Sequence, residues 1–188
     1  MRFIGWNRPS AVAVAGLAVA AAAAGGSAAS AASAHNASGP VVRLEAAQRS
    51  VTVRSSKGFV HMDPGIWLSS LGSALQFDVQ RASYTKPVTL TQVIHAPSGA
   101  AGKRPLPATL LDGWNGLKHF IRMTVRNASG TVVASPWLTF CPNTRDPQRA
   151  SPDSPAAQPY PSECGSQDPF TLSEVWGIAK GWATDPAE

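Results

Sequence analysis

Apolar residues recur at every second position in several parts of this chain, and this repeat constrains its fold more than any other feature. The clearest segment is Ala74–Ser83, where apolar residues such as Leu75 and Phe77 alternate with polar ones. Ser50–Ser55 alternates in the same way, and Pro87–His95 is rich in β-branched residues. Because successive side chains of a strand point to opposite faces of a sheet, the pattern predicts half-buried strands at all three places.

A β-hairpin is predicted between residues 119 and 140. His119–Arg126 and Thr131–Phe140 are the expected strands, and Asn127–Gly130 between them consists of turn-forming residues. Gly130 can adopt a positive φ without steric cost, which short hairpin connections often require.

Prolines interrupt the chain between the expected strands. Ala96–Pro107 is a Pro/Gly-rich connection, and Pro142–Pro169 contains seven prolines. Because proline fixes φ and lacks an N–H donor, the second segment is expected to be neither a regular helix nor an interior strand. These features predict an all-β fold, an antiparallel β-sandwich with a long Pro-rich loop, formed as one domain over residues 49–188. Residues 35–48 are expected to be a flexible leader.

The N-terminus has the three parts of a secretory signal peptide. Arg2 and Arg8 supply positive charge, Ala11–Ala24 is apolar, and small residues end at Ala34. The alternative is a membrane anchor, but this alanine-rich run is shorter than the roughly 20 residues that span a bilayer. We therefore expect residues 1–34 to be a signal peptide of bacterial type. The mature protein, beginning near His35, would be secreted to the extracellular space and would not be an integral membrane protein.

The charge of the mature part argues against a nucleic-acid partner. Loss of Arg2 and Arg8 with the signal lowers the formal net charge from +5 to +3. No Lys/Arg cluster in the mature part is longer than Lys103-Arg104. This is a weak electrostatic footprint for nucleic acid or an anionic membrane.

Cys141 and Cys164 are the only cysteines. Export would place them in an oxidising compartment, where a disulfide between them would close the Pro-rich loop. The alternative is two separate buried thiols. The pair lacks the spacing of a zinc cluster.

Motifs for catalysis are sparse. His61-Met62-Asp63 is a candidate copper or zinc loop, but an Asp before Pro64-Gly65 is also typical of a simple turn, which we favour. No Gly-x-Ser-x-Gly motif and no phosphate-binding Gly-rich loop occur. The five tryptophans of the mature part would form either a carbohydrate-stacking surface or, as we favour, core anchors. They are Trp67, Trp114, Trp137, Trp176 and Trp182.

The second half of the chain resembles the catalytic domain of lysyl oxidases over residues 110–185. Trp114–Cys141 has a strand, a turn with Gly130 and a return strand ending in Phe140-Cys141. Cys164-Gly165, followed by Trp176-Gly177-Ile178-Ala179-Lys180-Gly181-Trp182-Ala183, is similar to a Cys…Gly-Ile-Ser-x-Gly-Trp-Ala-Asp segment of that family. In that family further strands follow the segment that corresponds to Gly181-Trp182. The resemblance thus implies either that the sequence is a truncated reading of a longer protein or that the sandwich closes differently.

Lysyl oxidases bind copper with three histidines and build a quinone cofactor from a lysine and a tyrosine. The resemblance places the histidine positions at Leu111, Gly113 and Asn115, the lysine at Trp137 and the tyrosine at Pro186. None of these residues has the imidazole, amine or phenol that the chemistry needs. The resemblance therefore implies the scaffold without its activity and without a cofactor.

The sequence favours a secreted, non-catalytic β-sandwich that acts by binding a protein or a cell-envelope polysaccharide, or as an extracellular component of the envelope. One alternative is an enzyme, either a divergent copper-dependent amine oxidase or a hydrolase using His61, Asp63 and His119. Another is a cell-wall carbohydrate-binding module that uses exposed tryptophans.

Overall fold

The computed structural model describes residues 4–5, 40–57, 59–95 and 101–187. The predicted signal peptide lies outside the described residues except for Ile4–Gly5. Within the described parts the fold is all-β and antiparallel, and its only helical element is the short 3₁₀ turn η1 (Ala108–Leu110). No helix in these parts is long and apolar enough to cross a membrane.

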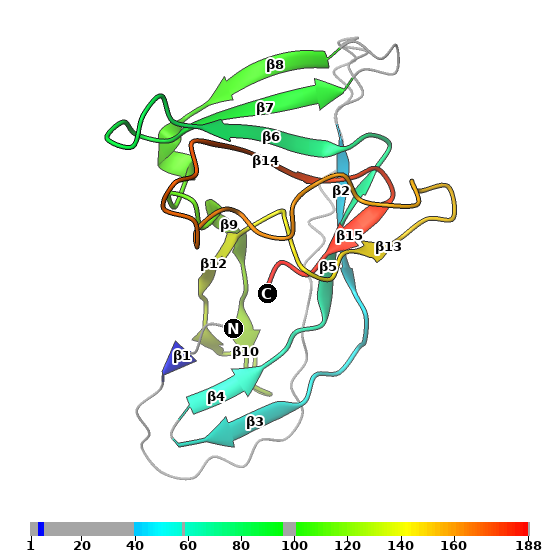
Figure 1. The fold of residues 1–188 in the computed structure, drawn as a ribbon. Coiled ribbons are helices and arrows are strands. Elements are labelled where there is room, and N and C mark those ends of the chain that lie inside the picture. Colours follow the sequence, from blue (N-terminus) through cyan, green and yellow to red (C-terminus); the bar gives the residue numbers. More distant parts are fainter. Residues whose placement is uncertain (1–3, 6–39, 58, 96–100, 188) are drawn as a thin grey trace, which may run out of the picture.

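Two four-stranded antiparallel sheets form the body of the molecule (Figure 1). The first has the order β13-β15-β5-β2 and the second the order β14-β6-β7-β8. The strands of the first sheet are β2 (Val41–Ala46), β5 (Ile66–Leu71), β13 (Gln148–Arg149) and β15 (Trp182–Thr184). Those of the second are β6 (Leu75–Gln80), β7 (Thr89–His95), β8 (Ala101–Leu106) and β14 (Ser173–Ile178).

Smaller strand pairs extend from this body. The long hairpin comprises β9 (Leu117–Arg122), β10 (Val125–Arg126), β11 (Val132–Ala134) and β12 (Trp137–Phe140). β9 pairs with β12, and β10 pairs with β11. A separate hairpin of β3 (Val53–Ser56) and β4 (Phe59–Met62), with β1 (Ile4–Gly5) beside β4, lies at the end of the molecule opposite β7 and β8 (Figure 1).

The period-two pattern correctly located several of these strands. Leu75, Phe77 and Val79 of β6 are all buried, whereas the residues between them are not. The hairpin turn is also as predicted: Gly130 has a φ of 81°, and the Asn127 Oδ1 accepts hydrogen bonds from the backbone N–H groups of Ser129 and Thr131.

Three segments differ from the sequence expectation. The first is Ser50–Ser55, expected as a half-buried strand: β3 begins only at Val53, and all four of its residues are exposed. The other two were not expected to be strands. Residues 41–46, placed in a flexible leader, form β2 and pair with β5 along their whole length. Residues 101–106, placed in a Pro/Gly-rich connection, form β8 and pair with β7. Both are edge strands within the described residues, with a partner strand on one side, so the weak alternation and Pro105 are tolerated.

The core lies where both sheets and the long hairpin meet. Trp176 and Ile178 of β14, Phe140 of β12 and Trp182 of β15 are buried there, together with Leu68 of β5. Trp114 packs edge-to-face against Trp176, with ring centroids 6.4 Å apart. Trp176 and Trp182 are thus core anchors, as favoured from the sequence.

Residues 141–172 cross the body as a loop with one short strand, β13. The predicted disulfide is present: Cys141 and Cys164 are bonded, with Cα atoms 5.9 Å apart. The buried Asn143 fastens the same loop to β14. Its Nδ2 donates to the carbonyls of Glu163 and Val175, and its Oδ1 accepts the N–H of Gly177. Such a disulfide is typical of an oxidising environment.

Reduction of the disulfide should destabilise the protein. Closing a loop of this length (sequence separation 23) restricts the unfolded chain and is worth about 3 kcal/mol. Denaturant unfolding with and without a reductant measures the difference. A Cys141→Ala/Cys164→Ala variant should match the reduced protein and ignore the reductant, and an unchanged free energy of unfolding on reduction would contradict the expectation.

Candidate functional site

The three positions where the lysyl oxidase resemblance places copper ligands lie in the tight turn between η1 and β9. Leu111 is buried in the core, Gly113 has a φ of 56°, and Asn115 is exposed with its N–H bonded to the carbonyl of Asp112. No group of three His, Cys, Asp or Glu residues suited to a metal ion occurs in the part of the chain that the structure describes. The residues present do not fit copper.

The positions of the quinone precursors have different surroundings. Trp137 lies on β12 with half of its surface exposed, whereas Pro186 is buried near the C-terminus. Neither side chain has an amine or a phenol, so no quinone can form from them.

The His61-Met62-Asp63 segment ends β4 and begins the favoured turn at Asp63. His61 lies in β4 opposite Arg54 of β3, and Asp63 Oδ1 accepts the backbone N–H of Gly65 at 2.8 Å. Gly65 has a φ of 55°, as this turn requires.

Trp137 is the most exposed of the five tryptophans considered from the sequence, with 50% of its surface accessible, so the favoured interpretation as a core anchor is wrong for this residue. Arg122 lies directly opposite it on β9 and places its guanidinium carbon 5.5 Å from the centre of the indole ring. The ring of His119 lies 5.6 Å from the same indole, tilted by 49°. We refer to Trp137, Arg122 and His119 as the Trp137 site.

A β-bulge brings His119 to this position. Leu138 pairs with Ile121 but Phe140 pairs with Leu117, so β9 has two more residues than β12 over this interval. Within the bulge His119 adopts a φ of 49°, a conformation that is uncommon for residues other than glycine. The bulge therefore turns a histidine toward the tryptophan where a regular ladder would not.

A hydrogen bond to Ser135 fixes the position of the Arg122 side chain. The Arg122 Nε donates to Ser135 Oγ at 2.9 Å, and this hydroxyl is also within hydrogen-bond distance of Thr124 Oγ1. A cation fixed over an aromatic ring contributes about 0.5–1 kcal/mol at an exposed site, and its pre-set geometry lowers the entropy cost of engaging a ligand.

Every charged residue of the segment that contains the site is basic. Residues 117–145 include Lys118, Arg122, Arg126 and Arg145 and contain no Asp or Glu. The Trp137 site thus combines an exposed aromatic surface with a local positive field, although the charge of the whole protein is modest.

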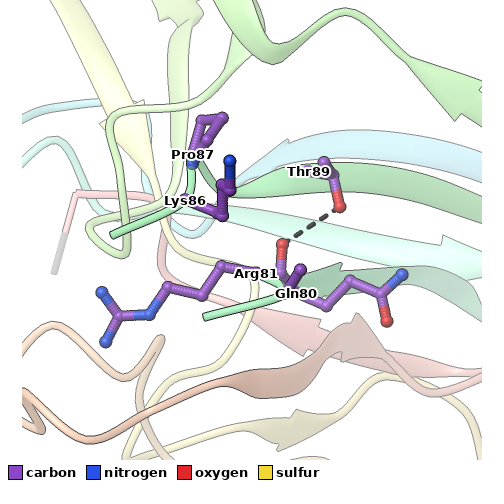
Figure 2. Close-up of a pocket in the computed structure, with 6 residues that line it drawn as sticks. Gln80, Arg81, Lys86, Pro87 and Thr89 are labelled. Carbon is purple, nitrogen blue, oxygen red and sulfur yellow. Dashed lines mark hydrogen bonds between the residues drawn. The ribbon is translucent and has the colours of Figure 1, made fainter. Parts of the chain in front are cut away.

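A second surface feature is an open groove at the β6–β7 turn (Figure 2). The Gln80 and Arg81 side chains extend in opposite directions there, and Thr89 Oγ1 donates to the Gln80 carbonyl at 3.0 Å (Figure 2). Arg81 is fully engaged by the protein: its Nε donates to the Thr171 carbonyl and an Nη to the Pro169 carbonyl. It therefore clamps two loops together and is not available to a ligand.

A polar network covers the outer face of the second sheet. The Gln76 Oε1 accepts from the Tyr160 hydroxyl at 3.3 Å and lies 2.9 Å from His95 Nε2. Gln76 Nε2 donates to Asp78, which also pairs with Lys103 at 2.8 Å. Burial, with Asp78 as a second cause, raises the pKa of Tyr160 above its ordinary value. The phenol is thus held neutral, and the network fixes a loop residue to the sheet rather than activating a nucleophile.

Tyr160 was not singled out from the sequence. Its ring lies over Gly177 of β14, where an added Cβ would stand 2.5 Å from the Tyr160 Cζ. Only a glycine permits this contact, so Tyr160 and Gly177 depend on each other across residues that are distant in the sequence.

Comparison with known proteins gives no relative: no family description, no curated protein and no solved structure matches the chain.

The backbone at His119 provides a test of the bulge. Replacing His119 by Val should lower the free energy of unfolding by about 1–2 kcal/mol, because a β-branched residue is strained at positive φ. His119→Asn should cost less, since asparagine tolerates this conformation. Equal stabilities of the two variants in urea unfolding would contradict the bulge.

Glu174 provides a pH test. Burial raises its pKa, the nearby Glu163 and Asp168 raise it further, and the Trp176 indole N–H, 3.2 Å from Oε2, opposes the shift. Because the folded protein then binds the proton more tightly than the unfolded chain, stability should fall as pH rises through the raised pKa. Glu174→Gln should reduce this loss, as measured by thermal unfolding from pH 4 to 8. A pH profile identical to that of the wild type would refute the assignment.

Proposed function

We propose that this chain is a secreted, non-catalytic binding protein whose β-sandwich is of lysyl oxidase type, and that it binds an anionic polysaccharide of the cell envelope. The Trp137 site is the observation that carries this proposal. It places a half-exposed tryptophan between an arginine and a histidine, and tryptophan and arginine are enriched among residues that dominate binding.

The chemistry of the site fits a charged sugar polymer. The flat indole face offers a surface for the apolar face of a sugar ring, and Arg122 is placed to meet a carboxylate or phosphate beside it. The absence of acidic residues from 117 to 145 removes a source of repulsion. Export, proposed from the N-terminal signal and supported by the disulfide, would bring the site to such polymers.

A non-catalytic role is supported by the residues at the positions of the lysyl oxidase chemistry. Leucine, glycine and asparagine stand where copper would need histidines, and tryptophan and proline stand where the quinone would need a lysine and a tyrosine. We therefore expect no quinone stain and no amine-dependent peroxide release from the purified protein.

Binding to polygalacturonate, with neutral dextran as the comparison, tests the proposal. Trp137→Ala should weaken binding to the anionic polymer by on the order of tenfold or more, a loss of about 1.4 kcal/mol. Arg122→Ala should weaken it as well and should make it less sensitive to salt.

Tyr84→Ala is the matched control, because Tyr84 is also an exposed aromatic (57%) but lies at the β6–β7 turn. It should bind like the wild type. Equal binding to dextran and polygalacturonate, or an equal loss in Tyr84→Ala and Trp137→Ala, would refute the proposal, and a positive quinone stain would refute its non-catalytic part.

A further inference from the structure

The two four-stranded sheets have four edge strands: β13 and β2 in the first sheet, β14 and β8 in the second. An edge strand presents a row of free N–H and C=O groups that can pair with another chain. Proteins protect such edges with very short strands, charged side chains, prolines or a covering segment. Three of these four edges are protected by a covering segment, by a proline or by their short length.

The edge of β14 is covered by the long loop. Arg81 N–H bonds to the Leu172 carbonyl, so the alternation of the ladder directs Val175 and Gly177 toward the free edge. Asn143 binds the Val175 carbonyl and the Gly177 N–H with its side-chain amide. The edge is thus satisfied within the chain.

The edges of β8 and β13 are protected by their residues and length. β8 contains Lys103, Arg104 and Pro105, two charges followed by a residue without an N–H. β13 has two residues, Gln148 and Arg149, and follows Pro147. Neither is a template for another strand.

β2 is the edge with the least protection. Its two charged residues, Arg43 and Glu45, are of opposite sign and pair with each other, and no backbone hydrogen bond from the described residues reaches its outer side. The strand is six residues long, contains no lysine or proline, and pairs with β5 along its whole length on one side. Its apolar side chains are exposed: Val41 by 58%, Leu44 by 50% and Val42 by 39%. Among the described residues this is a regular strand edge without a second partner strand, and it is apolar apart from Arg43 and Glu45.

The free backbone groups of β2 can be assigned from the ladder. Ala47 N–H bonds to the Gly65 carbonyl at 2.8 Å, in register with the pairing of β2 and β5. Since bonded and non-bonded residues alternate in an antiparallel pair, Val42, Leu44 and Ala46 direct their N–H and C=O groups to the open edge.

We propose that β2 pairs with β2 of a second copy of this chain, antiparallel, with Leu44 opposite Leu44 of the partner subunit. In this register Val42 lies opposite Ala46 of the partner subunit. The residues that would form the hydrogen bonds between the two strands are therefore those whose N–H and C=O groups point away from β5. The β13-β15-β5-β2 sheets of the two copies then form one continuous eight-stranded sheet across a twofold axis.

The charges of β2 favour the same register. Arg43 lies opposite the partner's Glu45, and the twofold axis repeats this pair. Within one chain Arg43 and Glu45 are on the same face and 3.6 Å apart, so they are already positioned for cross-strand pairing. Opposite charges at non-hydrogen-bonded positions bring their side chains close and contribute favourably.

Val42, Leu44 and Ala46 lie on the other face, whereas Val41 shares the face of Arg43 and Glu45. Leu44 pairs in register with Leu68 of the core, so it shares the face of the first sheet that contributes to the core. Contact between Leu44 and Leu44 of the partner subunit extends this apolar layer from one copy into the next. Burial of leucines that are half exposed in the single chain adds to the association.

Sedimentation of the purified protein over a dilution series tests the proposal. The wild type should reach a dimer. Arg43→Glu places two acidic pairs across the interface and Glu45→Arg two basic pairs, so each variant alone should dimerise on the order of tenfold more weakly. An equimolar mixture of the two should dimerise, because each interface then contains opposite charges. The doubly exchanged variant Arg43→Glu/Glu45→Arg should also dimerise.

Arg54→Glu on β3 is the control, since it makes the same charge change at an exposed position outside β2. It should leave dimerisation unchanged, and thermal unfolding should show that all variants fold. A wild type that stays monomeric throughout the series overturns the proposal. So does a dimer unaffected by either single change, or a mixture of the two variants that fails to associate.

Discussion

The attachment of the long loop to β14 is the constraint on which the rest of the structure depends. The Cys141–Cys164 disulfide brings both ends of the loop together, and Asn143 is thereby placed where its amide satisfies the free edge of β14. A buried side-chain amide whose N–H and C=O groups are hydrogen-bonded fixes the loop in one position, because any other position would leave buried polar groups without hydrogen bonds. The loop thus completes the second sheet instead of leaving it open.

This attachment also fixes the interior. Trp176 and Ile178 of β14 are fully buried between the sheets, and Phe140, next to Cys141, joins them from the long hairpin. A glycine at residue 177 lets Tyr160 pack against the outer face of the same strand. β14 is therefore stabilised by the Asn143 amide at its edge, by the core on one face and by Tyr160 on the other, and the disulfide fixes the loop that carries Asn143 and Tyr160.

The surfaces proposed for binding lie away from this rigid centre. The Trp137 site is on the hairpin, where a bulge and a positive φ at His119 gather an aromatic ring and two basic side chains. The β2 edge lies on the first four-stranded sheet, β13-β15-β5-β2, and is defined by backbone groups as much as by side chains. The two surfaces have different chemistry, one for a charged polymer and one for a second copy of the chain, so they can operate independently.

The sequence by itself determined the strands whose two faces differ in polarity, such as β6, along with the hairpin turn at Asn127–Gly130 and the pairing of two lone cysteines. Each follows from local physics: side-chain alternation, glycine at positive φ, and the single pairing available to two thiols. Only the tertiary structure decided that residues 41–46 and 101–106 are strands, because an edge strand takes its partner from elsewhere and needs little alternation of its own. The same holds for the Trp137 site and for Tyr160. Their contacts join residues 15 to 84 positions apart, and such proximity is set by sheet register and a bulge rather than by any local pattern.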